Sequence, residues 1–183
     1  MEYRESNKDS LVIINTGGGK GKTTAALGLA LRAAGHGHKV LILQFIKDAW
    51  KTGESKIMER LGPEIEMEQL GRGFIKFVDG KMQITEKDRE NAEASIQYAK
   101  EKINSGKYDM VILDEINNVL AYELIDIREV IDIIRERPKR LSLVLTGRGV
   151  PDELIDIADT VSEIREIKHA YSKGIKAKKG IEY

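Results

Sequence analysis

The residues best suited to chemistry in this chain form the run GGGKGKTT at positions 17–24. Its glycines allow backbone N–H groups to converge on an anion without obstruction by Cβ atoms. Lys22 brings a positive charge to phosphate oxygens, and the hydroxyl of Thr23 is suited to Mg²⁺. A flexible glycine turn is the alternative interpretation. The run predicts a phosphate-binding loop whose nucleotide-contacting residues are Gly17, Gly18, Gly19, Lys20, Gly21, Lys22, Thr23 and Thr24.

The spacing of this loop departs at one position from the common pattern G-x-x-x-x-G-K-[ST]. That pattern requires a glycine at position 16, where this chain has Thr16. An apolar run precedes the loop and an alanine-rich segment follows it, so the order is still strand, glycine turn and helix. The missing glycine raises the question of whether the nucleotide is used in a different way.

A second candidate is the acidic pair Asp114–Glu115, which ends the apolar run MVILDE at positions 110–115. Ligands of α/β proteins bind at the carboxyl ends of strands, so this pair is placed to hold the shell of a Mg²⁺ or Mn²⁺ ion together with Thr23. Capping of the next turn is the alternative role for such a pair. With the loop, the pair indicates Mg-ATP, and Lys22, Thr23 and Glu115 are the predicted catalytic groups. Kinases, ATPases and switches share these parts, so the type of reaction stays open at this point.

Strands that position these residues are indicated by runs that are apolar throughout. Continuous rather than alternating runs are typical of parallel strands covered on both faces. The four runs are 11–14, 40–45, 110–115 and 141–146. We expect a further strand around 65–70 and an edge strand within 160–167.

Helical patterns lie between these strands. One begins near Lys22, one covers 85–105 with a capping-box spacing of Thr85 and Asp88, and one covers 126–136. Pro151 can open a short helix. Strands that alternate with helices predict an α/β domain with helices on both faces of the sheet. Residues 47–84 show few strong periods and are interpreted as a long functional connection.

Composition sets outer limits on function. The chain has 183 residues, 30 basic and 30 acidic side chains and no cysteine. That length suits one domain, and the zero net charge argues against a general nucleic-acid binder. No apolar run is long enough to span a bilayer and the start is polar, so we expect a cytoplasmic protein without a membrane partner. We divide the chain into a polar tail (1–10), a nucleotide-binding domain (11–167) and a C-terminal tail (168–183).

Taken in order, the segments resemble the ATP:corrinoid adenosyltransferases of the cobalamin pathway. The similar segments begin with GGGKGKTTAALGLALRAAGHGHKVLILQFIK and AWKTGE, and continue with YDMVILDEINNVLAY and VLTGRG. DTVSEIREIKHAY and KGIKAKKGIEY complete the resemblance, which covers nearly the whole chain from about residue 11. Members of that family also lack the first glycine of the common pattern, the position held here by Thr16.

The resemblance implies a RecA-like P-loop fold, a homodimer and transfer of the 5′-deoxyadenosyl group from ATP to cobalt(I) of a corrinoid, with release of triphosphate. Substrates of the family include cobalamin, cobinamide and cobyrinic acid a,c-diamide, and a flavoprotein supplies the electrons by analogy. Arg32 and Arg148 would face the nucleotide, although Arg32 without the resemblance is better read as a solvated helix residue. The C-terminal tail would fold back on the domain, whereas its lysines alone indicate a solvated end.

The corrinoid would lie beneath the 47–84 connection, against Phe74, Phe77 and Trp50. Packing in the core is the alternative role for Phe74, and the role of Trp50 is equally open. The chain departs from the family at Lys76, where a tryptophan is expected, and in its short N-terminus.

The reaction implied by the resemblance suits these residues because cobalt(I) is already a strong nucleophile and has no proton to lose. His36 and His38 follow the first predicted helix and have no obvious carboxylate partner, so neither is read as a general base. Two rival functions stay open: a kinase or ATPase that acts at the γ-phosphate, and a regulator that binds ATP and corrinoid without turnover.

Overall fold

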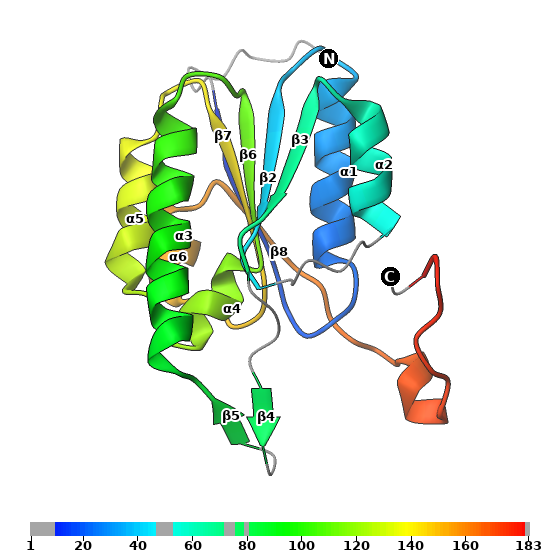
Figure 1. Ribbon diagram of the computed structural model, residues 1–183. Coiled ribbons are helices and arrows are strands. Elements are labelled where there is room, and N and C mark those ends of the chain that lie inside the picture. Colours follow the sequence, from blue (N-terminus) through cyan, green and yellow to red (C-terminus); the bar gives the residue numbers. More distant parts are fainter. Residues whose placement is uncertain (1–9, 47–52, 72–75, 79–80, 182–183) are drawn as a thin grey trace.

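The computed structural model describes residues 10–46, 53–71, 76–78 and 81–181. Its main feature is a six-stranded parallel sheet with the order β3-β2-β6-β7-β1-β8 (Figure 1). The strands are β1 (Val12–Thr16), β2 (Val40–Gln44), β3 (Ile65–Gln69), β6 (Met110–Asp114), β7 (Ser142–Thr146) and β8 (Thr160–Glu163). The predicted α/β fold is confirmed, and the four apolar runs form the inner strands.

Helices cover both faces of this sheet. α1 (Lys22–Ala34) and α2 (Gly53–Leu61) lie on one face, and α3 (Glu86–Asn104), α5 (Ile127–Glu136) and α6 (Asp152–Ile157) lie on the other (Figure 1). Side chains of the inner strands alternate between two apolar clusters. Ile112 and Val144 pack with the α1 side, whereas Leu113 and Leu145 pack with the α3 and α5 side. This two-sided burial explains why the inner strands carry apolar side chains on both of their faces.

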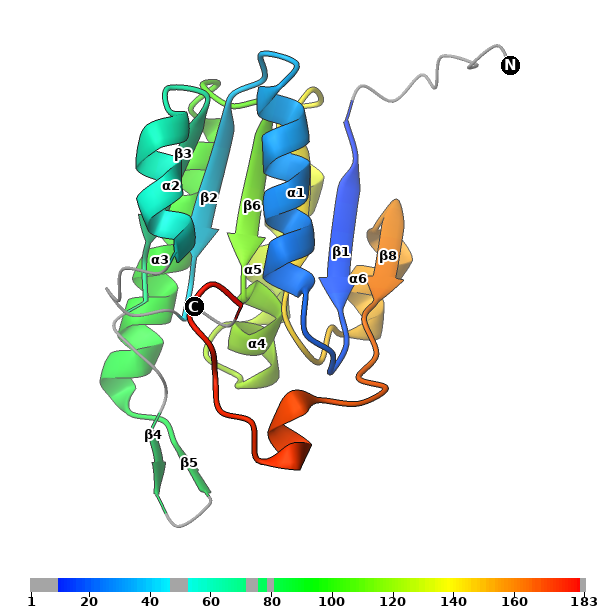
Figure 2. The same ribbon diagram turned by 90° about the vertical axis from the view of Figure 1, so that its right-hand side faces the viewer.

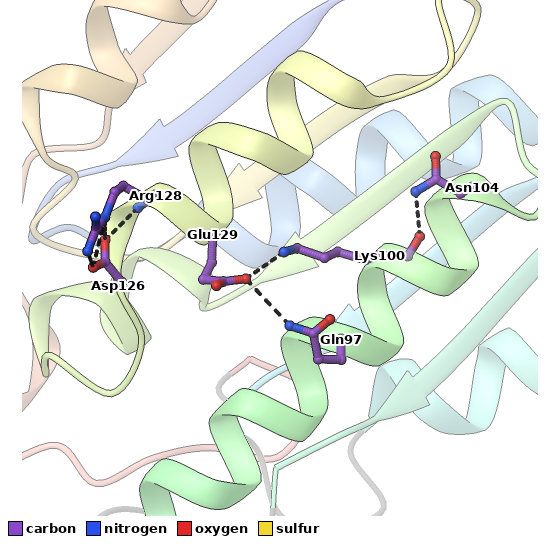
Figure 3. Close-up of polar contacts among 6 residues, drawn as sticks. All are labelled: Gln97, Lys100, Asn104, Asp126, Arg128 and Glu129. Atoms are coloured by element: carbon purple, nitrogen blue, oxygen red, sulfur yellow. Dashed lines mark hydrogen bonds and ion pairs between the residues drawn. The ribbon is translucent and has the colours of Figure 1, made fainter.

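The α3–α5 layer forms for reasons that are visible in the sequence. α3 begins with the predicted capping box, in which Thr85 and Asp88 each accept a backbone N–H of the other. Polar side chains then join the two helices across their exposed faces, where Lys100 and Gln97 of α3 both donate to Glu129 of α5 (Figure 3).

Residues 53–84 contain more regular structure than the sequence predicted. The expected strand is β3, but it follows α2 and precedes a separate hairpin of β4 (Lys76–Val78) and β5 (Lys81–Gln83). α2 has only nine residues, which are too few for a helical period to repeat clearly, and its apolar side chains include the buried Met58 and the 39 % exposed Ile57. The predicted edge strand within 160–167 is β8, and it ends at Glu163.

The strands β1, β6 and β7 end at the same edge of the sheet, which is its lower edge in Figure 2. α4 (Ile116–Ala121) follows β6 there. The chain after β8, which we call the C-terminal segment (164–181), contains the 3₁₀ turn η1 (Ala170–Lys173) and runs below this edge (Figure 2). In the described parts of the chain, no helix combines the length and apolar character that crossing a membrane requires.

Candidate nucleotide-binding site

A cavity of about 720 Å³ opens at the carboxyl edge of the sheet. It brings together both motifs singled out from the sequence, although they lie far apart along the chain. The predicted residues that line it are Gly18, Gly19, Lys20, Gly21, Lys22, Thr23, Thr24, Glu115 and Arg148. One cavity is therefore lined by the phosphate-binding loop, by Glu115 just after the apolar strand β6, and by an arginine.

The loop after β1 is held in a curved shape by its own lysine. Lys22 is 8 % exposed, and its Nζ donates to the carbonyl oxygens of Gly17 and Gly19, each at 2.8 Å. Gly17 therefore shapes the loop although it does not line the cavity. Burial lowers the pKa of Lys22, the positive charge of Arg148 lowers it further, and Glu115 and Asp114 oppose these effects.

The chain that follows β8 packs directly against this loop. Gly19 N–H donates to the Ile164 carbonyl at 2.7 Å, and Ile164 N–H donates to the Thr16 carbonyl at 2.8 Å. A Cβ on Gly19 would lie 2.7 Å from the Ile164 carbonyl oxygen, and one on Gly17 would lie 2.5 Å from it. Two of the loop glycines are therefore required because another backbone segment approaches closely.

Asp114 lies at the centre of a buried hydrogen-bond network. Its Oδ1 accepts from the hydroxyls of Thr23 at 2.9 Å and Thr146 at 2.7 Å, and its Oδ2 accepts from Gln44 Nε2 at 3.0 Å. Gln69 extends the network by donating to Gln44 Oε1. These bonds fix the carboxylate beside the hydroxyl of Thr23.

Glu115 adopts a left-handed backbone conformation with φ of 68°. Few residues other than glycine and asparagine adopt this backbone conformation, and backbone strain of this kind concentrates at functional sites. Its N–H donates to the hydroxyl of Thr146 at 2.9 Å, which helps to stabilise the strained residue. Glu115 lines the cavity at the N-terminus of α4.

Arg148 reaches the cavity from the loop that follows β7. Its backbone N–H donates to Asn118 Oδ1, and the preceding Gly147 has φ of 133°. A Cβ on Gly147 would lie 2.6 Å from the same Asn118 oxygen. α4 therefore fixes the position of the arginine loop.

The sequence matches the family described as ATP:corrinoid adenosyltransferase BtuR/CobO/CobP over residues 8–183. The chain belongs to this family. It is 41 % identical over 173 residues to the corrinoid adenosyltransferase of Escherichia coli K12, a match that covers 94 % of this chain and 85 % of that protein. The corrinoid adenosyltransferase CobA of Salmonella typhimurium LT2 matches with the same identity and coverage.

A solved structure supports the fold on independent grounds. The crystal structure of the KaiC-like protein PH0186 from Pyrococcus horikoshii OT3 aligns with a TM-score of 0.54 at 16 % identity, over 89 % of this chain and 76 % of that one. At this identity the likeness concerns the fold alone, which is the RecA-like P-loop architecture in both proteins.

Some residues expected in the site of this corrinoid adenosyltransferase are not brought to the cavity. Arg32 is exposed in the last turn of α1, and the rise of a helix places it about 15 Å from Lys22 along the axis. The expectation that Arg32 faces the nucleotide is therefore not supported within one chain. Phe77 lies in β4, and Trp50 and Phe74 lie outside the described residues.

Several cavity residues of this family member were missed from the sequence. Asn118 and Tyr122 come from α4 and its C-terminal end, and Glu166, His169 and Ile181 come from the C-terminal segment. None belongs to a short motif with its own chemistry, so spacing alone did not reveal them. The exposed His36 and His38 lie after α1, at the opposite edge of the sheet from the cavity.

The oxygens beside the loop fit Mg²⁺. The Thr23 hydroxyl and the Asp114 carboxylate are hard ligands 2.9 Å apart, and Glu115 lines the same cavity. Within the described ranges, no group of three or more His, Cys, Asp or Glu side chains could hold a metal ion.

Proposed function

We propose that this chain transfers the 5′-deoxyadenosyl group of Mg-ATP to the cobalt(I) centre of a corrinoid and releases triphosphate. The observation that carries the proposal is the cavity in which the shortened loop, the Asp114 network and Arg148 meet in a member of the ATP:corrinoid adenosyltransferase family. Cobalamin, cobinamide and cobyrinic acid a,c-diamide are the candidate corrinoids.

The bonds balance without an added acid or base. Cobalt(I) supplies an electron pair to the ribose C5′, the bond between C5′ and the triphosphate oxygen breaks, and that oxygen leaves with its pair. Cobalt becomes formally cobalt(III) in the new cobalt–carbon bond. Because no proton moves at the reacting atoms, the site needs alignment and charge stabilisation rather than a general base.

The protein groups suit this division of work. Lys22 and Arg148 line the cavity, and together with backbone N–H groups of the loop they would stabilise the negative charge that builds up on the leaving triphosphate. Thr23, Asp114 and Glu115 would hold the magnesium ion, which neutralises phosphate charge when bound. Glu115, at the N-terminus of α4, would also hold the side of the nucleotide that lies nearest to this helix.

The finer features of the proposal rest on the family resemblance. We propose that Phe74, Phe77 and Trp50 contribute to the corrinoid side of the site, and that residues 168–183 fold back on the nucleotide-binding domain (11–167). A homodimer, a cytoplasmic location and a flavoprotein that reduces the corrinoid belong to the same proposal.

The test is an anaerobic reaction with Mg-ATP and chemically reduced cob(I)alamin. The visible spectrum reports the cobalt–carbon bond, and phosphorus NMR identifies the phosphate product. A light-sensitive alkylcobalamin formed with triphosphate supports the proposal. Formation of ADP would instead indicate a kinase or ATPase, and binding without either product would indicate a regulator.

A pair of lysine variants controls this experiment. Lys22→Ala removes the buried cation that faces the phosphates and should abolish transfer. Lys39→Ala changes an exposed lysine just before β2, at the other edge of the sheet, and should leave the rate unchanged. Removal of divalent ions with EDTA should also stop the reaction, with recovery on addition of Mg²⁺ or Mn²⁺.

A further inference from the structure

The C-terminal segment is fixed to the phosphate-binding loop at its start. Ile164 exchanges backbone hydrogen bonds with Thr16 and Gly19 on either side of the loop's first turn. A Cβ on Gly19 would also lie 2.8 Å from the carbonyl carbon of Arg165. Residues 164–165 therefore keep a defined position relative to the phosphate-binding loop.

From this contact the chain continues along the cavity. Glu166 and His169 line it shortly after Arg165, and Gly180 and Ile181 line it again further along the chain. His169 follows Arg165 by four residues, a stretch that spans at most about 14 Å, so the contact of Ile164 with the loop limits how far His169 can lie from it.

The orientation of the His169 ring is set by the turn that follows. His169 is the N-cap of η1, and its Nδ1 accepts the backbone N–H of Tyr171 at 3.2 Å. A neutral imidazole that accepts through Nδ1 carries its proton on Nε2. The half-buried ring therefore presents Nε2–H as a donor and has its acceptor nitrogen already engaged.

We propose that His169 is a substrate-contacting residue whose Nε2–H donates to the triphosphate part of the nucleotide. This inference rests on the proposed function and extends its site from the loop to the C-terminal segment. A neutral donor suits a leaving triphosphate, because it stabilises the growing charge through a hydrogen bond and keeps its own proton. The capping bond aligns the donor before the substrate arrives, so little ordering remains to be done on binding.

Calorimetric titration with inorganic tripolyphosphate and Mg²⁺ tests this contact without requiring turnover. His169→Asn keeps an acceptor for the Tyr171 N–H, since asparagine is a good N-cap, but it lacks a donor at the Nε2 position. His169→Gln can place its amide N–H₂ near the Nε2 position. We expect binding to weaken about tenfold in His169→Asn and to return to within about threefold of the wild type in His169→Gln.

The outcomes separate this contact from the function as a whole. Wild-type affinity in His169→Asn would overturn the proposal, and so would equal weakening in the Asn and Gln variants, because the Nε2 donor would then not be the determining group. Circular dichroism of each variant checks that η1 and the sheet remain folded. If tripolyphosphate binding depends on His169 but no cobalt–carbon bond forms with ATP, the contact stands and the proposed function fails.

Discussion

Two glycine-containing loops on neighbouring strands enter the same cavity, and they are held in different ways. Besides its own Lys22, the loop after β1 is held by the backbone of a distant segment, because Gly19 N–H donates to the Ile164 carbonyl. The loop after β7 is held by a side chain, because Arg148 N–H donates to Asn118 Oδ1. In both loops a glycine lies where a Cβ would collide with that partner. The first loop therefore depends on its own glycines, whereas the second also depends on a residue of α4.

Gly19→Ala should have the largest effect on the free protein. The new Cβ would lie 2.7 Å from the Ile164 carbonyl oxygen and close to the Arg165 backbone, so the two segments must separate. Overpacking against atoms that cannot rotate away should lower the free energy of unfolding by about 3 kcal/mol. Urea unfolding in the absence of nucleotide measures this loss.

Gly18→Ala provides the matched control. No atom lies within 4 Å of a Cβ built at Gly18, and its φ is not positive. Its unfolding free energy should stay within about 0.5 kcal/mol of the wild type. If Gly18→Ala and Gly19→Ala lower the free energy of unfolding equally, the close approach of residues 164–165 is not the reason for a glycine at position 19.

Thr146→Val should cause the next largest loss of stability, since Thr146 joins the end of β7 to Asp114 and Glu115 at the end of β6. Its fully buried hydroxyl donates to Asp114 and accepts from the strained Glu115 N–H. Valine has the same shape but leaves that N–H without its acceptor, at a cost of about 2 kcal/mol in the free energy of unfolding.

Thr146→Ser keeps the hydroxyl and should recover most of this stability. Thermal unfolding of both variants, together with the KM for ATP, separates the hydrogen bond from the lost methyl group. A serine variant as unstable as the valine variant would show that the methyl group matters as much as the hydroxyl that links Asp114 to Glu115, and a valine variant as stable as the wild type would show that the link is not required.

These contrasts also show which features the sequence could predict. The four inner strands follow from continuous apolar runs, and the loop at 17–24 is a local motif, so both were found from neighbouring residues alone. α2 was missed because its apolar stripe is short, and the expectation for Arg32 came from the resemblance alone and stays a prediction, because its helical position is exposed and away from the cavity of the same chain. Asn118 and His169 line the cavity from α4 and from the irregular chain after β8, a placement that only the folded chain reveals.

Asn118→Ala should act mainly on substrate binding. The variant loses the bond that fixes the Arg148 loop, so the guanidinium becomes less ordered before it meets the nucleotide. We expect the KM for ATP in the adenosyl-transfer assay to rise about fivefold to tenfold, which corresponds to the loss of one hydrogen bond of about 1 kcal/mol. Asn104→Ala, on the exposed face of α3 (Figure 3), should leave KM unchanged. An unchanged KM in Asn118→Ala would mean that the arginine loop holds its position without α4.

Ile164→Ala should have the smallest effect on ATP, although Ile164 makes the bonds that hold the first loop. Both of those bonds use its backbone N–H and carbonyl, which alanine retains. We therefore expect a KM for ATP within about twofold of the wild type, even if some apolar packing is lost. Ile164→Pro removes the N–H that donates to Thr16 and should raise KM well above that of the alanine variant. If instead alanine and proline raise KM equally, the first loop depends on a partner side chain, as the second loop does, and the distinction between the two loops does not hold.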